Sequence, residues 1–414
     1  MPWIKRDGKL IILSRGLRIF AQGSIAVLLA IYLGKIGLSL VEIGAFFSIG
    51  VAGSAVLAFT VSLMAEKIGR KRLLVLFALV AAISGIALIF STSFQVLAIF
   101  AFLGSIGGTA GAGPSGPLFP LEQASLASTA PPERRTDVFA LYGIVATAGS
   151  AIGALASGLP DFFQRSLGLG ELASFKIIFG GYVAILVIAS FIYLFLSPAI
   201  EVHVSQQRWT NPFKLPSRKL IFTLVGLFSI DRFSGSMVIQ SLVAYWFSTR
   251  FNIKISELGI IFFISYILEA FSIWLAARIA HRLGLLNTMV FTHIPSSIFL
   301  IAATFAPAGW LAVLFWQLRS LVGSMDVPTR DSYTMAIVSP EERVAMASIH
   351  VVGGSITSTA GPSFTSFLWS IFSAQVPFVV AGIIKIAYDL SLYSIFRNVK
   401  PPEEIGKSKV RSVP

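Results

Sequence analysis

Five charged side chains lie within long apolar segments of the chain: Arg18, Asp231, Arg232, Glu269 and Arg319. A carboxyl group held in lipid can take up or release a proton as its surroundings change. An arginine there can hold an anionic solute or act as the counter-charge of a carboxylate. The alternative is a set of static ion pairs that hold helices together. We predict that the five residues bind the substrate or couple its movement to that of an ion.

Metal, nucleotide and covalent chemistry have no support in the sequence. The chain has no cysteine, and no phosphate-binding GxxxxGK[ST] motif, which argues against an ATP-driven pump. We expect no metal, no cofactor and no enzymatic activity, and keep a membrane-embedded enzyme or a non-transporting receptor as a remote alternative. The four histidines show no H-x-x-x-H or H-E-x-x-H spacing: His203, His281, His293 and His350.

The composition requires lipid as the solvent for the elements that carry these charges. Hydrophobic residues make up 55% of the 414 residues and charged residues only 12%, with a mean hydropathy of +0.83. Apolar blocks such as 177–197 and 285–306 hold no Asp, Glu, Lys or Arg, and each is about as long as a helix that crosses the hydrocarbon core. Helices are favoured over barrel strands because the blocks are long and continuously apolar.

We therefore predict an all-α polytopic membrane protein with twelve transmembrane helices. A central polar segment, 198–217, separates an N-terminal six-helix half, 1–197, from a C-terminal six-helix half, 218–397, which a basic tail, 398–414, follows. The predicted spans are 10–33, 41–64, 72–91, 95–124, 137–160, 174–197, 218–249, 256–279, 285–306, 309–338, 345–372 and 376–397.

The positive charges alternate between loops. Basic residues gather in the N-terminal segment, the tail, the 198–217 segment and every second loop, so the positive-inside rule places both termini in the cytoplasm. The net charge of +13 follows this sidedness, and we expect no nucleic acid partner. The predicted location is the plasma or inner membrane, with the lipid bilayer as partner and the chain as a monomer.

The two halves repeat each other. Polar, proline and glycine landmarks recur at nearly constant offsets, which is the pattern of a transporter whose site lies between related halves. The landmarks are Pro120 and Pro328, Pro132 and Pro340, and Gly153 and Gly361 at an offset of 208, Tyr32 and Tyr245 at 213, and Glu42 and Glu257 at 215.

The loop between the second and third spans, 62–72, reads S-L-M-A-E-K-I-G-R-K-R. It is similar to the G-x-x-x-D-R/K-x-G-R/K-R/K motif of the major facilitator superfamily, which the chain resembles over essentially its whole length. A carboxylate and a guanidinium at a helix end can form a breakable latch, and a glycine permits the tight turn. We predict a cytoplasmic gate that contains Glu66, Gly69, Arg70 and Lys71 from this loop, and Glu122, Arg330 and Asp331 from the inner ends of spans four and ten.

The fifth span carries Gly149-x-x-x-Gly153, similar to a glycine motif of family members that exchange substrate for protons. Close helix packing is the alternative use of such glycines. We also expect Asp326 to pair with Arg330, and Lys385 with Asp389 as a structural pair, because each pair is spaced i, i+4.

The resemblance implies the two-bundle fold of the superfamily, with spans one, four, seven and ten lining a central cavity. It implies secondary transport of a small organic solute by alternating access. Proton-coupled efflux is the favoured form, with a gradient-driven importer of a sugar or organic anion as the alternative.

Overall fold

Helices are the only regular structure within the described residues, which are 3–110, 116–131, 134–201, 216–339 and 342–399 of this computed structural model. A helix satisfies its backbone hydrogen bonds within one segment, as lipid requires. The predicted all-α class is therefore confirmed. Most of the predicted 198–217 segment and of the 398–414 tail lies outside the described residues.

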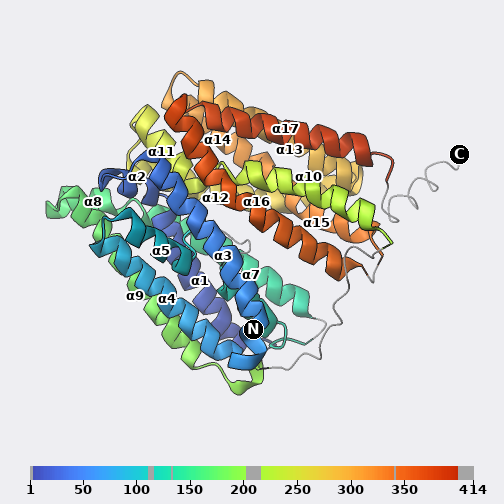
Figure 1. Ribbon diagram of the computed structural model, residues 1–414, viewed down its shortest axis with the longest axis horizontal. Helices are drawn as coiled ribbons and strands as arrows, with labels where there is room; N and C mark the ends of the chain where they lie inside the picture. The colour runs from blue at the N-terminus through green and yellow to red at the C-terminus, as the bar shows by residue number, and fades with distance from the viewer. Residues whose placement is uncertain (1–2, 111–115, 132–133, 202–215, 340–341, 400–414) are drawn as a thin grey trace, which may run out of the picture. The chain divides into compact units, whose positions relative to one another are not determined.

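The N-terminal half forms nine α-helices and a short 3-10 helix within the described residues (Figure 1). These are α1 (Arg6–Ala26), α2 (Leu29–Lys35), α3 (Leu40–Ile68), α4 (Arg70–Phe90), α5 (Phe94–Gly104), α6 (Leu118–Leu126), α7 (Arg135–Ala156), α8 (Leu159–Leu167), α9 (Glu171–Leu194) and η2 (Pro198–Ile200).

The C-terminal half forms eight helices within the described residues. These are α10 (Arg218–Ser236), α11 (Gln240–Phe251), α12 (Ile255–Leu283), α13 (Leu285–Phe305), α14 (Gly309–Gly323), α15 (Asp326–Ile337), α16 (Arg343–Ile371) and α17 (Val376–Phe396).

Each of the twelve predicted spans coincides with one helix or with two successive helices. Spans one, four, five, seven and ten are the pairs α1–α2, α5–α6, α7–α8, α10–α11 and α14–α15. In the described part of the chain, eight spans pass a test of length and hydropathy, and the α1–α2 pair, bent by 44°, is a ninth. Two of the other three, spans four and ten, are divided into shorter helices, and the third is α16, which is rich in Gly, Ser and Thr.

Span four is divided into two helices. α5 ends at Gly104, Ser105 has a left-handed φ of 55°, and α6 begins after Pro117. The break leaves α6 as a short separate helix that carries Glu122.

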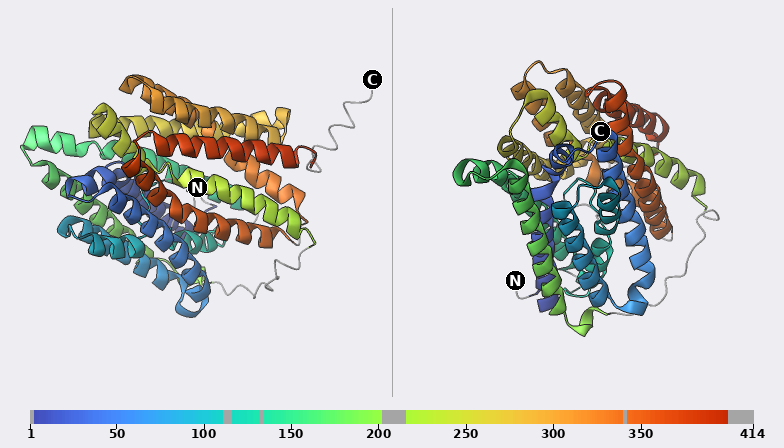
Figure 2. Two further views of the ribbon diagram at one scale, coloured as in Figure 1. Left: turned by 45° about the horizontal axis from the view of Figure 1, so that its top comes forward. Right: turned by 60° about the vertical axis from the view of Figure 1, so that its left-hand side comes forward.

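The chain folds into two compact units. Unit 1 comprises Met1–Gln207, Ile239–Tyr266 and Pro362–Ile371, and unit 2 comprises Arg208–Val238, Ile267–Gly361 and Phe372–Pro414. In unit 1, α1 packs along α7 and α4 along α9, and in unit 2, α13 packs against α14 and α17 (Figures 1 and 2). Parts of the predicted C-terminal half thus group with unit 1, and the predicted boundary between halves stays a prediction.

Glycines allow α1 and α7 to approach closely. A Cβ at Gly149 would lie 2.9 Å from the carbonyl oxygen of Gly16, and a Cβ at Gly23 would lie 2.8 Å from that of Ser150. A Cβ at Gly153 would meet the carbonyl oxygen of Phe20. Close packing of backbones therefore accounts for the glycines of span five, as in other membrane helix pairs.

We expect Gly153→Ala to lower the thermal unfolding temperature of the detergent-purified protein. The added methyl group would meet backbone, and overpacking of this kind costs about 1–3 kcal/mol. Gly143→Ala on the same helix is the control, since no atom lies within 4 Å of its Cβ position. Equal unfolding temperatures for the two variants would contradict the close packing of α1 on α7.

Candidate functional site

Glu122 of α6 is the centre of a buried polar cluster in unit 1. Its carboxylate accepts hydrogen bonds from Arg18 Nη2 at 2.6 Å, Tyr142 OH at 2.7 Å and Tyr193 OH at 2.5 Å. Arg18 Nε also donates to Tyr193 OH at 3.1 Å, and Arg15 Nη1 lies 4.0 Å from the carboxylate. We call these five residues the Glu122 cluster. They come from α1, α6, α7 and α9, so the cluster ties four helices together.

The carboxylate of Glu122 is fully engaged by its partners in the cluster. A buried carboxylate that lacks partners is costly, and this one has an ion pair and two tyrosine hydroxyls. The guanidinium of Arg15 also lies over the ring of Tyr142, 4.9 Å from its centroid. The structure brings Arg18 and Glu122 together in one packed cluster. The predicted roles of Arg18 in substrate binding or coupling and of Glu122 in a gate stay predictions.

Asp231 of α10 is the centre of a second buried cluster, in unit 2. Its two carboxylate oxygens accept hydrogen bonds from different partners: Oδ1 from Lys385 Nζ at 2.7 Å and Oδ2 from Arg330 Nη1 at 2.9 Å. Arg330 also lies 3.4 Å from Asp326, which confirms the predicted i, i+4 pair. Its ion pairs link α10, α15 and α17. The predicted role of Asp231 in substrate binding or coupling stays a prediction.

His293 of α13 extends this cluster. Its Nδ1 lies 3.0 Å from Oδ2 of Asp389, and its Nε2 lies 3.2 Å from Nζ of Lys385. We call Asp231, His293, Asp326, Arg330, Lys385 and Asp389 the Asp231 network. Lys385 and Asp389 were expected to pair with each other along α17, and this is corrected: each instead pairs with a side chain of another helix.

The two clusters occupy equivalent places in the internal repeat. Asp231 lies 213 residues after Arg18, and Arg330 lies 208 residues after Glu122, the same offsets that relate the tyrosine and proline landmarks. Glu122 and Arg330 are each the fifth residue of their helix. Each half therefore joins its first and fourth spans with one buried ion pair, and the charges are reversed between halves.

Glu269 of α12 and Arg319 of α14 differ from both clusters because they are only partly buried in unit 2. They interact electrostatically, yet no ion pair within 4.0 Å joins them in the described part of the chain. The guanidinium of Arg319 lies over the ring of Trp316, 4.7 Å from its centroid. An arginine whose planar face rests on an aromatic ring keeps its edge donors available for a carboxylate.

Arg232 and Asp331, the other predicted residues of unit 2, have exposed side chains. Arg232 is the sequence neighbour of Asp231, and its stem packs against Gly354 of α16. The two neighbours thus differ, since Asp231 is buried in the network and Arg232 is not. Their roles in binding and in the gate stay predictions.

The loop between α3 and α4 is held by Glu201, a residue that the sequence did not indicate. Its carboxylate accepts from the backbone N–H groups of Arg70 at 2.7 Å and Lys71 at 2.9 Å, where the N-terminus of α4 favours negative charge. Gly69 has a φ of 97°, which confirms the predicted tight turn, while Glu66 is exposed. A latch through Glu66 stays a prediction.

The side chains of Arg70 and Lys71 bind carbonyl groups within unit 1. Arg70 Nη1 donates to the carbonyl oxygen of Ile200 at 3.1 Å, and Lys71 Nζ to that of Leu196 at 2.8 Å. These contacts anchor α4 to the end of α9 and to η2.

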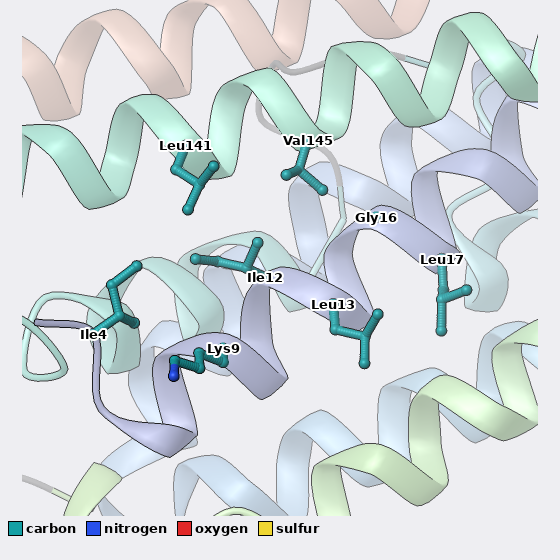
Figure 3. Close-up of a pocket in the computed structure, with 8 residues that line it drawn as sticks. All are labelled: Ile4, Lys9, Ile12, Leu13, Gly16, Leu17, Leu141 and Val145. Atoms are coloured by element: carbon teal, nitrogen blue, oxygen red, sulfur yellow. The ribbon is translucent and has the colours of Figure 1, made fainter. Parts of the chain in front are cut away.

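A hollow of about 460 Å³ lies beside α1 and α7 (Figure 3). Apart from Lys9, its lining is apolar, and none of the predicted site residues contributes to it. It offers a solute no converging polar groups, so we do not assign it as the site. Its lining residues are Ile4, Lys9, Ile12, Leu13, Gly16, Leu17, Leu141 and Val145.

Comparisons with known proteins agree with the fold and with the repeat. The profile of the Major Facilitator Superfamily matches residues 11–245 and 221–414. The chain is 26% identical to an uncharacterized membrane protein of Saccharomyces cerevisiae, over 95% of each chain.

Two solved transporters show the same fold. The nucleoside transporter NupG superposes with a TM-score of 0.72 and 16% identity, covering 94% of this chain and 99% of that one. A bacterial homolog of the human lysosomal transporter Spinster, inward-facing and unoccupied, superposes with a TM-score of 0.74 and 16% identity, covering 95% and 98%. The profile match extends over both halves of the sequence, and the chain belongs to the Major Facilitator Superfamily.

Proposed function

We propose that this chain carries a small organic anion across the membrane by alternating access, together with a proton. Membership of the superfamily supports secondary transport in general. The observation that carries the finer proposal is the pair of Glu269 and Arg319, which are partly buried, oppositely charged and not joined by an ion pair in the described residues.

The chemistry of Arg319 favours an anion. A guanidinium in a partly buried place lacks full hydration, and a carboxylate or phosphate supplies the bidentate partner that it lacks. The ring of Trp316 covers one face of the guanidinium and so orients its donors. A neutral sugar would leave this charge without a counter-charge.

Glu269 gives a reason for proton coupling. When ionised, it attracts Arg319 and repels an incoming anion, and when protonated it does neither. The anion and the proton therefore bind best together, which is the condition for symport. The export reading depended on the glycines of span five, and those glycines are accounted for by packing against α1. We therefore propose symport in place of efflux.

We propose that both termini are cytoplasmic, on the evidence of the basic loops. The chain lacks cysteine, so single-cysteine variants can be labelled from one side of the membrane. Arg135 and Arg165 are exposed residues at opposite ends of the α7–α8 span.

In intact cells, an impermeant maleimide is expected to label Arg165→Cys and to leave Arg135→Cys unlabelled until the membrane is opened. Labelling of Arg135→Cys alone in intact cells would reverse the proposed orientation.

In proteoliposomes, we expect an inward proton gradient to drive uptake of at least one radiolabelled carboxylate from a panel of lactate, succinate and glutamate. Glucose and uridine serve as neutral probes in the same vesicles. Uptake that continues unchanged after ionophores collapse the pH gradient and the membrane potential would exclude proton coupling. Transport of the neutral probes alone would exclude the anion.

Arg319→Lys is expected to keep the charge but lose the bidentate geometry, and so raise KM for the transported anion roughly tenfold, the equivalent of one good hydrogen bond. Arg278→Lys is the matched control, since Arg278 also lies over a tryptophan, Trp274, at 3.6 Å. Both variants are measured for uptake and for unfolding temperature. An equal rise of KM in both would remove Arg319 from the site.

Glu269→Gln imitates the protonated carboxyl group. It is expected to retain exchange of labelled for unlabelled anion while losing stimulation by the proton gradient. Gradient-driven uptake at the wild-type rate in this variant would show that Glu269 is not the coupling group.

A further inference from the structure

The ring of His293 is held on both of its nitrogens by charged groups. Nδ1 lies 3.0 Å from Asp389 Oδ2, and Nε2 lies 3.2 Å from Lys385 Nζ. Nε2 also lies 3.8 Å from Asp231 Oδ1, the oxygen that accepts from Lys385. All of these side chains are buried, so the contacts operate where water does not compensate for an unfavourable charge.

These contacts select one form of the ring. An ammonium group can only donate, so Nε2 must accept from Lys385 through its lone pair, and the carboxylate of Asp389 can only accept, so Nδ1 must carry the hydrogen. His293 is therefore neutral and protonated on Nδ1 in this arrangement. Addition of a proton to Nε2 would use the lone pair that now binds Lys385.

The charges of the Asp231 network leave room for one more proton. Its three carboxylates are those of Asp231, Asp326 and Asp389, and its two cations are Arg330 and Lys385. With a neutral His293 these six side chains carry one negative charge in excess, which the electrostatic attraction of Arg232 to Asp231 and Asp326, and of Arg319 to Asp326, offsets in part. A positive charge on the imidazole would balance it, and excess charge is expensive in a buried site.

Outside the Asp231 network, the helices that pack against α13 place no proton acceptor against the ring in the described residues. α15 presents Asp326, Arg330 and the exposed Asp331, and Tyr388 of α17 presents its ring 6.2 Å from the imidazole. The charged residue of α14 is Arg319, whose backbone oxygen accepts from Ser296 of α13. The acceptors that face His293 are thus the carboxylates of the network itself.

We propose that Nε2 of His293 is a proton-binding atom, and that its protonation displaces Nζ of Lys385. The proton adds to the Nε2 lone pair, the hydrogen bond from Lys385 breaks, and the imidazolium then lies between Asp389 and Asp231. Lys385 and the new N–H group compete for the same oxygen of Asp231, so the tie between α10 and α17 changes with the proton. This inference rests on the proposed proton coupling and adds a second proton-binding group, besides Glu269.

The equivalent place in the first half has no such group. The Glu122 cluster consists of one carboxylate, two arginines and two tyrosines. In model compounds, none of these side-chain types changes its charge near neutral pH. The proton switch thus belongs to the C-terminal half, although both halves share the buried ion pair.

The test is a pH titration of ring nitrogen NMR signals in the full chain labelled with 15N-histidine. His293→Gln assigns the signals, because glutamine can donate to Asp389 and accept from Lys385 but cannot become charged. We expect the neutral ring to be the Nδ1–H form and to gain one proton on Nε2 as the pH is lowered. A ring that stays neutral throughout the titration, or an Nε2–H tautomer, would overturn the proposal.

A second measurement follows the pH dependence of the unfolding temperature. One linked proton shifts it by up to on the order of 2 °C per pH unit in wild type, and His293→Gln is expected to remove that component. His350→Gln is the matched control and should keep it. His350 is a histidine of the same unit whose ring meets that of Phe228 edge to face. Equal pH profiles for wild type and His293→Gln would overturn the proposal.

The two proposals fail on different observations. Uptake that does not depend on the proton gradient, together with a His293 ring that takes up a proton, would refute proton coupling but not the proton site. Gradient-driven uptake, together with a His293 ring that stays neutral, would refute the proton site but not proton coupling.

Discussion

A charge placed within a membrane must find an opposite charge, and this constraint organises both halves of the protein. In each half, the first and fourth spans are joined by one buried ion pair at the same place in the repeat: Arg18 with Glu122, and Asp231 with Arg330. The charges are reversed, so it is the pairing that the two halves share, rather than the residue types. Both carboxylates also accept hydrogen bonds from further helices: Glu122 from α7 and α9, and Asp231 from α17.

The surroundings of the two pairs give them different properties. Tyrosine hydroxyls complete the shell of Glu122, and a phenol stays neutral at physiological pH, so this cluster has one stable arrangement. Lys385, His293 and Asp389 complete the shell of Asp231, and an imidazole, unlike a phenol, has a second nitrogen that can take up a proton. We propose that the buried ion pair is a fixed contact in one half and responds to a proton in the other.

The spans could be predicted from sequence because they follow from hydropathy, which is a local property. The contents of the clusters could not, because Asp231 and Lys385 are 154 residues apart and His293 lies in a block without Asp, Glu, Lys or Arg. The spacing of Lys385 and Asp389 on α17 was recognised, but i, i+4 spacing does not exclude stronger partners on neighbouring helices. Equal offsets in the repeat were the one signal that related Arg18 to Asp231 before their partners were known.

Glu269 and Arg319 are informative because they depart from the rule that the two clusters obey. Paired charges within the membrane can be explained by stability alone, whereas a partly buried arginine without an ion pair in the described residues cannot, since the same fold places partners elsewhere with N–O distances of 2.6 to 2.9 Å. An anion gains more from a cation that is not already paired, so we propose that the solute supplies the partner that Arg319 lacks. The complete pairs hold the helices of each unit together.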